Sequence, residues 1–285
     1  KMVSETGTVK PAQGVDLAFQ TAGRIAAVFA NVGSRISAEQ AIAMLDASEL
    51  KAQLAKARAN LTAQTAKLDE DQTKLNNSYA DVKNTLNSAY TSANDAVRIK
   101  VEPFFKDTET NNPLLSFYSN NSQSQIDAQN QRLAMTAMLN GWIKEISAIS
   151  ADTPTSTLEQ NLANAVLNLN NIQGFLNILN TTLLNAPALS QTTISTYKGY
   201  VSSARSAIDS ALASVNTLLK SIASEKAALV SDTATIQSYE AEIDDINAQI
   251  SKTTMYSPIA GVVTKQDAEV GEIAASQNAS KATVT

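Results

Sequence analysis

The chain has 285 residues, a formal net charge of −5 and neither cysteine nor histidine. These absences exclude disulfides, thiolate metal sites, cysteine nucleophiles and histidine bases, and the acidic balance gives no basic stripe for a nucleic-acid backbone. No apolar run approaches the ~18–20 residues that span a bilayer, and we expect a membrane anchor ahead of Lys1, because the chain starts in mid-pattern.

Both ends of the chain carry the same eleven-residue pattern, Gly-x-(Ile/Val)-x-x-x-x-Ala-x-Val-Gly. The first copy is residues 23–33 and the second is residues 261–271. Before the first copy, Val15, Leu17 and Phe19 alternate with polar or small residues, which predicts a half-buried strand. Each copy is expected to be a strand that turns at its second glycine. Two matched halves at opposite ends of the chain predict one small β domain assembled from both.

A long helix is expected after the first copy. Asp46 followed by Glu49 resembles a capping box, and no proline or glycine then interrupts the sequence until Pro103. Apolar residues recur every seven positions, at Leu54, Leu61, Leu68, Leu75, Val82, Ala89 and Ala96. The pattern predicts one helix over residues 47–101, ~80 Å long at 1.5 Å per residue.

The middle of the chain predicts two shorter helices. The first covers residues 123–149, and its apolar face is Met135, Met138, Leu139, Trp142, Ile146 and Ile149. The second is expected to begin with another capping box, Ser156 with Glu159, and to end before Pro187. Its apolar residues alternate in steps of four and three: Leu158, Leu162, Ala165, Leu169, Ile172, Leu176, Leu179 and Leu183. This alternation is typical of a complete helix–helix seam.

The returning segment has the most regular repeat. Eight consecutive heptads are marked by Val201, Ile208, Val215, Ile222, Leu229, Ile236, Ile243 and Ile250. A strict seven-residue repeat keeps one stripe against a partner helix when the pair supercoils left-handedly. We expect a second, incomplete stripe four residues further on. Leu212 and Leu219 fit this stripe, whereas Lys226, Thr233 and Glu240 do not.

Three segments resemble the periplasmic adaptor family, also called membrane fusion proteins and HlyD-like proteins. Gly23 to Ile36, with 40–46, resembles the first lipoyl half-motif of the family. Leu50 to Leu61 resembles the start of its helical hairpin, and 256–272 resembles its second half-motif. The resemblance covers roughly residues 3–61 and 250–285, in the order that the family has. The stretch 83–200 has no counterpart in the simple hairpin of the family.

The resemblance and the periodicity together predict a mainly α fold with a small β domain. We expect a long antiparallel α-helical hairpin (a coiled coil) with an inserted helical hairpin, which gives a four-helix distal bundle, on a split lipoyl-like β-sandwich. The expected parts are partial β-barrel strands at 1–22 and 280–285, the lipoyl-like domain at 23–46 and 255–279, the long hairpin at 47–102 and 189–254, and the inserted hairpin at 103–188.

For function, the resemblance implies a non-enzymatic periplasmic or extracytoplasmic adaptor subunit of a multi-component export or efflux pump. Such a subunit couples an inner-membrane transporter, of ABC or RND type, to an outer conduit. The resemblance also implies a homo-oligomer, with a hexamer as the expected form. It further implies that the protein is anchored to the cytoplasmic membrane through a segment absent from this chain. Engagement of an outer-membrane channel or another envelope component stays open, because no Arg is followed at +4 by Leu, the spacing found at the tip of the family's hairpin.

Two other classes stay open: a helical-bundle sensor or receptor ectodomain, and a surface structural coiled-coil protein. Neither would need the two glycine-bounded repeats. No catalytic residue, cofactor or metal ligand is expected. The position at which lipoyl carriers hold their acceptor lysine is occupied by the helical insertion, and Lys265 is expected to be a solvated surface residue. The acidic runs at 69–71 and 240–245 are typical of a solvated coiled-coil face.

Two groups of residues are candidates for a functional role. The candidate structural motif is Gly23, Val32, Gly33, Pro258, Gly261, Val270 and Gly271. The candidate distal contact is an aromatic group in and near the loop between the predicted helices: Phe104, Phe105, Phe117, Tyr118 and Trp142. For this aromatic group, core packing at the four-helix end is the alternative to contact with another protein or envelope layer.

Overall fold

The computed structural model describes residues 14–108, 110–275 and 282–285. The chain divides into two compact units. The split unit comprises residues 1–68 and 231–285, and the helical unit comprises residues 69–230. The parts of the predicted β-barrel strands that fall in 1–13 and 280–281 lie outside the described residues.

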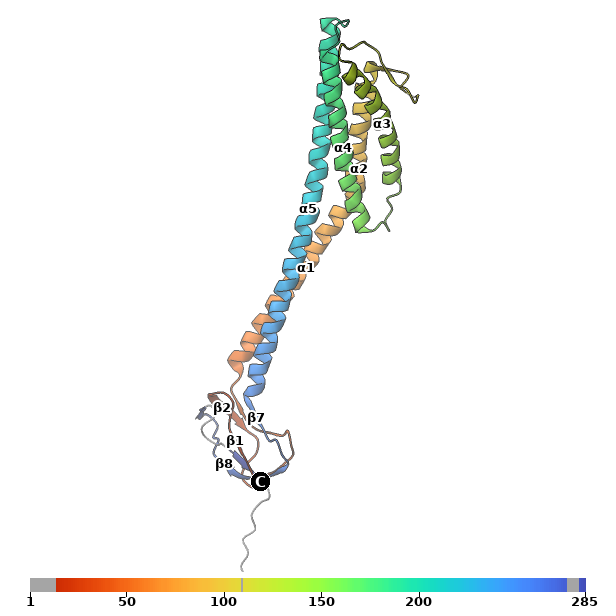
Figure 1. The fold of residues 1–285 in the computed structure, drawn as a ribbon. Helices are drawn as coiled ribbons and strands as arrows, with labels where there is room; N and C mark the ends of the chain where they lie inside the picture. Colours follow the sequence, from red (N-terminus) through yellow and green to blue (C-terminus); the bar gives the residue numbers. More distant parts are fainter. Residues whose placement is uncertain (1–13, 109, 276–281) are drawn as a thin grey trace, which may run out of the picture. The chain divides into compact units, whose positions relative to one another are not determined.

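Two four-stranded antiparallel sheets form the β part of the split unit (Figure 1). Their strands are β1 (Val15–Leu17), β2 (Gly23–Val28), β3 (Arg35–Ile36), β4 (Ala41–Leu45), β7 (Thr254–Tyr256), β8 (Gly261–Gln266), β9 (Ile273–Ala274) and β10 (Ala282–Val284). One sheet has the order β1-β10-β8-β3 and the other has the order β7-β4-β2-β9. Each sheet therefore takes strands from both ends of the chain, as the repeated pattern predicts.

Apolar side chains from both sheets share one core. The buried members include Leu17, Phe19, Ile25, Ile36, Ile42, Leu45, Met255, Val263, Ala282 and Val284. The strand predicted from the alternation at Val15 is present as β1, and Phe19 is buried just beyond its end. Because β1 and β10 pair with each other and β10 pairs with β8, the first and last described strands belong to the same sheet as the second copy of the pattern.

Two long helices leave this β part: α1 (Ser48–Ala80) and α5 (Gln191–Lys252). The Asp46 carboxylate accepts the Ser48 N–H at 2.9 Å, and hydrogen bonds from Ser48 lower the pKa of that carboxyl. The first i→i−4 bond of α1 runs from Lys51 N to the Ala47 carbonyl at 2.9 Å. The N-cap position is therefore Ala47, one residue later than the predicted capping box places it.

The helix predicted over 47–101 is present as consecutive segments. After α1, Asp81 keeps a right-handed helical backbone (φ −77°, ψ −12°) and α2 (Val82–Asp95) begins. A π-helical turn, η1 (Ala96–Lys100), and a 3₁₀ turn, η2 (Glu102–Phe104), follow. The wider π turn lets two successive side chains, Ala96 and Val97, both face the core. The buried positions step by four and three from Val82 to Ala96 and resume one residue later at Val97 and Val101, so the π turn shifts the buried face by one residue.

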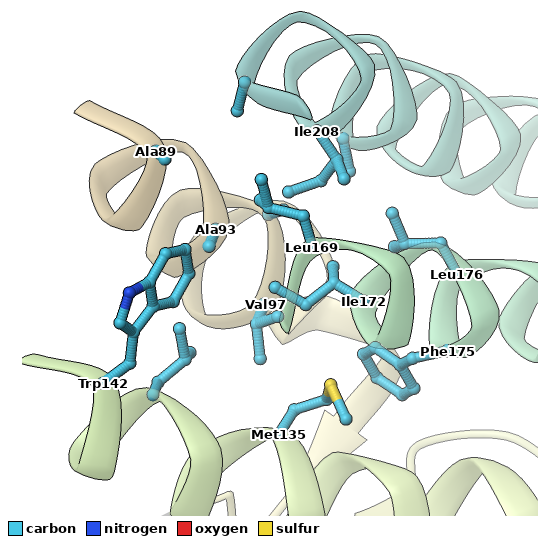
Figure 2. Packing of buried hydrophobic residues seen from close by; sticks show 14 of the residues in the cluster. Ala89, Ala93, Val97, Met135, Trp142, Leu169, Ile172, Phe175, Leu176 and Ile208 are labelled. Atoms are coloured by element: carbon cyan, nitrogen blue, oxygen red, sulfur yellow. The ribbon is translucent and has the colours of Figure 1, made fainter. Parts of the chain in front are cut away.

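The helical unit is completed by α3 (Ser122–Ser147), α4 (Thr155–Leu184) and a short hairpin of β5 (Phe105–Lys106) and β6 (Leu114–Leu115). All eight residues of the predicted α4 seam are buried, and so is the predicted face of α3 except Met138, which is half-buried. Figure 2 shows Leu169, Ile172 and Phe175 of α4 among Val97 of η1, Met135 of α3 and Ile208 of α5. The four-helix bundle predicted from periodicity is confirmed.

One local prediction is wrong. The Ser156–Glu159 capping box does not form: Pro154 holds the N-cap position of α4 with no side-chain cap, and Glu159 bonds to Tyr79 and Lys226 instead. The incomplete stripe of α5 agrees with the prediction, because Leu212 and Leu219 pack against the core while Lys226, Thr233 and Glu240 are exposed. An additional row of α5, not predicted, lies three residues after the heptad positions. Its buried members are Ala204, Ala211, Asp232 and Ile246. Small residues there let a neighbouring helix approach closely, which the hydrophobicity pattern alone does not show.

Candidate functional site

The two turn glycines hold the ends of the chain together. Gly33 and Gly271 have nearly equal positive φ values, 89° and 91°, in a region that side-chain-bearing residues rarely adopt. Each donates its N–H to the other copy. Gly33 N bonds to the Val263 carbonyl at 2.8 Å, and Gly271 N bonds to the Ile25 carbonyl at 2.9 Å. Val263 and Ile25 occupy the same third position of the pattern, so the two bonds are equivalent.

The return bonds are equivalent as well. Ile25 N donates to the Glu272 carbonyl at 2.8 Å, and Val263 N donates to the Ser34 carbonyl at 3.0 Å. Glu272 and Ser34 each follow the turn glycine of their own copy. Strand pairing repeats the exchange, since β2 pairs with β9 and β3 pairs with β8. The repeated sequence thus forms a local twofold clasp, in which each copy completes the other.

The first glycine of each copy is needed for close approach rather than for its φ. A Cβ added to Gly261 would lie 2.5 Å from the Thr285 carbonyl oxygen, a backbone atom. A Cβ added to Gly23 would lie 3.2 Å from the flexible end of the Leu45 side chain. The sequence pattern treats these two glycines alike, but only Gly261 faces backbone.

The other members of the structural motif lie on the surface. Val32 is 62% exposed and Val270 is 67% exposed, and Pro258 is exposed too. Sequence reasoning missed the neighbouring Ser257, which is buried and whose hydroxyl donates to the Ile259 carbonyl at 2.7 Å. Its backbone also bonds to Gln40 and Glu39 of the first half. A serine before proline gives no signal for this role by itself.

Four of the five aromatic candidates in the helical unit are buried: Phe104, Phe105, Phe117 and Trp142. Phe104 stacks on Tyr197 of α5 with ring centroids 4.4 Å apart, and the Tyr197 hydroxyl donates to the Pro103 carbonyl at 2.9 Å. Tyr118 alone is open to solvent, with 60% of its surface exposed. Burial favours core packing for the four, so contact with another envelope layer stays a prediction that rests on Tyr118.

A buried cation fixes the loop between α2 and α3. Arg132 is 1% exposed, lies 5.9 Å from the centroid of the Phe105 ring and reaches the Glu102 carboxylate at 3.4 Å. The Thr108 hydroxyl donates to the same carboxylate at 2.7 Å. These bonds connect the β5–β6 hairpin to α3, so the conformation of the segment between α2 and α3 is fixed by side-chain contacts.

Side-chain chemistry elsewhere is sparse in the described ranges. Lys265 lies 2.6 Å from Asp267, which raises the pKa of the lysine, and it is exposed. In residues 14–108, 110–275 and 282–285, no group of three or more acidic side chains is placed to hold a metal ion. Within the same ranges, no helix has both the length and the apolarity that crossing a bilayer requires.

A scan against protein-family models and a search of curated proteins find no match. Solved structures do match. The structure of the periplasmic adaptor protein EmrA superposes with a TM-score of 0.52 and 15% identical residues, over 97% of this chain and 73% of that chain. This chain has the periplasmic adaptor fold. The fold that the two half-motifs predict is thereby confirmed.

Two further structures match the adaptor fold of this chain less closely. MacA from Actinobacillus actinomycetemcomitans has a TM-score of 0.38 and 13% identity, over 95% of this chain and 50% of that chain. The soluble domain of LipC, a membrane fusion protein of a type I secretion system, has a TM-score of 0.35 and 12% identity, over 96% of this chain and 99% of that chain. TM-scores below 0.5 do not by themselves establish a shared fold.

A three-residue clamp joins α1, α4 and α5 in the helical unit of this adaptor fold. The Tyr79 hydroxyl donates to the Glu159 carboxylate, and Lys226 Nζ lies 3.0 Å from the same group. Burial and the bond to Glu159 raise the pKa of Tyr79 to about 12. The bonds from Tyr79 and Lys226 lower the pKa of Glu159 below its ordinary value of 4.5.

We expect Glu159→Gln to destabilise the helical unit at neutral pH by roughly 0.5–1 kcal/mol, as for a partly exposed ion pair. Because the folded state lowers the carboxyl pKa, the stabilisation is present above the ordinary pKa and is lost as pH falls through the folded value. Urea unfolding at several pH values measures this difference, which should begin to shrink near the ordinary carboxyl pKa of 4.5 and vanish below the lowered pKa of the folded state. Glu145→Gln on the exposed face of α3 is the control. A difference that stays constant down to pH 3 would contradict the clamp.

Proposed function

We propose that this chain is a non-enzymatic adaptor subunit of an export or efflux pump, located in the periplasm or another extracytoplasmic space. The observation that carries the proposal is the adaptor fold, in which a twofold clasp of glycine-bounded halves closes the ends of a long helical insertion. The protein would act as a spacer and coupler between an inner-membrane transporter, of ABC or RND type, and an outer conduit.

The proposal includes self-association and membrane attachment. Adaptor copies would form a ring, with a hexamer as the expected form, and would be anchored to the cytoplasmic membrane through a segment outside this sequence. The split unit, with its exposed Val32 and Val270 beside the turn glycines, is the part that we expect nearest the transporter.

A test uses the full-length protein in its own membrane. It should co-purify with a transporter encoded beside its gene, and light scattering of the purified full-length protein should give a mass near six copies. Deleting the gene should raise cellular retention of that transporter's cargo. A stable dimer that binds no transporter would overturn the proposal and favour a helical sensor or receptor ectodomain, which also uses long helical bundles.

A further inference from the structure

An uncharged surface covers most of α4 in the helical unit. Glu159 is the last charged residue before Lys198, so 38 consecutive residues, 160–197, carry no charge. These residues include nearly all of α4. In contrast α1, of similar length, carries nine charged residues: Glu49, Lys51, Lys56, Arg58, Lys67, Asp69, Glu70, Asp71 and Lys74. A solvated helix face normally carries mixed charges, and loss of charge is typical of interface cores.

The exposed residues of α4 form a second seam opposite the buried one. They follow steps of three and four: Gln160, Ala163, Leu167, Asn170, Gly174, Asn177, Thr181 and Leu184. We call this row the α4 stripe. Leu167 and Leu184 are each 61% exposed. Steps of three and four place these residues on one face of the helix, and within the described chain nothing covers that face.

A groove lies between α2 and α5 of the same unit. It is lined by Asn84, Thr85, Ser88, Ala89, Ser92, Ser210, Ala211 and Ser214. We call it the α2–α5 groove. These lining residues are small and none is charged, whereas the neighbouring hollow toward Ser78 and Ser221 also contains the exposed Asp81. The uncharged length from Asn84 to Ser92 is about 12 Å of helix, against about 36 Å for the α4 stripe, so only part of the stripe fits in the groove.

We propose that the α4 stripe of one copy docks into the α2–α5 groove of a second copy of this chain. We infer a second copy as the occupant from the charges of the two surfaces. A partner with charged side chains would have to desolvate them against α4, whereas the α2–α5 groove is lined only by hydroxyl, amide and methyl groups. Shape agrees, because protruding Leu167 needs a hollow between small residues. The stripe and the groove are different surfaces, so the contact is head-to-tail and builds a ring or a filament.

This inference rests on the self-association within the proposed function and gives it a specific surface. The absence of cysteine from the chain permits a clean test, because single introduced cysteines report contacts without background. The 285-residue chain carrying Leu167→Cys is mixed with a size-tagged chain carrying Ser88→Cys and mildly oxidised. We expect the mixed disulfide to exceed either homodimer at least tenfold. Ala137→Cys, exposed on α3, is the control and should give no specific product.

A charge at the stripe should weaken the contact. Leu167→Lys is expected to weaken self-association at least tenfold by light scattering, while Ala137→Lys leaves it unchanged. Because Leu167 is exposed, both variants should keep the wild-type melting temperature, which separates lost docking from misfolding. If disulfides between two Leu167→Cys chains predominate, the α2–α5 groove is not the docking site and α4 pairs with α4 of the second copy.

Full association of Leu167→Lys, or no mixed disulfide from assembled protein, would overturn the inference and leave the adaptor function standing. Failure of the full-length protein to bind its transporter would instead count against that function, whatever the disulfides show.

Discussion

Truncation of Phe175 to alanine is expected to destabilise the helical unit by about 3–5 kcal/mol, the range for large aromatic side chains in cores. Phe175 is fully buried on α4 and stacks on Phe105 with ring centroids 6.1 Å apart. Its removal would also loosen the β5–β6 hairpin, because Phe105 would lose this contact. The free energy of unfolding of a domain is only about 5–15 kcal/mol. The variant should therefore retain only a small part of the stability of the helical unit.

Trp142 offers a local probe of this effect. It is the single tryptophan of the chain, it is 2% exposed, and it belongs to the same hydrophobic core. Urea unfolding followed by its fluorescence therefore reports the helical unit alone. Phe175→Leu should cost less than about 1.5 kcal/mol, and Leu167→Ala on the exposed face of α4 should change stability by less than about 0.5 kcal/mol. Equal stability of Phe175→Ala and wild type would contradict the core described above.

Replacement of Gly261 by alanine is expected to destabilise the split unit by about 3 kcal/mol, near the upper end for overpacked sites. The new Cβ would lie 2.5 Å from the Thr285 carbonyl oxygen, so backbone has to move. That carbonyl accepts the Val262 N–H at 2.8 Å, and Thr285 N donates back to Val262 at 3.0 Å. Both bonds would be strained or broken.

The matched control is the equivalent glycine of the other copy. Gly23→Ala should cost about 1 kcal/mol or less, because the Leu45 side chain can rotate away. Hydrogen exchange of the Val263 and Ile25 amides measures both variants within the split unit. Faster exchange should appear in Gly261→Ala and be small in Gly23→Ala. Equal effects would mean that the two positions are equally crowded, contrary to the structure.

Periodicity was sufficient to predict the helices that bury one face. The steps of four and three in α4 identify all eight of its buried seam residues, because a packed helix has to repeat apolar residues near that spacing. The glycine pattern likewise predicts which ends of the chain meet. It does not show the bonds exchanged through Gly33 and Gly271, since backbone partners leave no mark on side-chain identity.

The incorrect capping box and the buried row that was not predicted share one physical cause, which is a partner far away in the sequence. Glu159 has the spacing for a local cap, but Tyr79, 80 residues earlier, takes its carboxylate. The additional buried row of α5 uses Ala204, Ala211 and Asp232, which a hydrophobicity pattern scores as weak or polar. Asp232 is tolerated there because Lys67 Nζ lies 2.7 Å away. Local propensity cannot rank such partners.

The bonds that Ile25 makes with Gly271 and Glu272 also constrain the order in which the molecule folds. During synthesis the first half of the clasp leaves the ribosome more than two hundred residues before the second half. Its strands therefore remain unpaired until the second half has been synthesised. The helical unit can collapse earlier, since its core needs only residues within 69–230. Its closure brings Ser78 and Glu225 within 3.0 Å, which shortens the remaining loop and lowers the entropic cost of joining the two ends. We therefore expect the β part to fold after the helical unit.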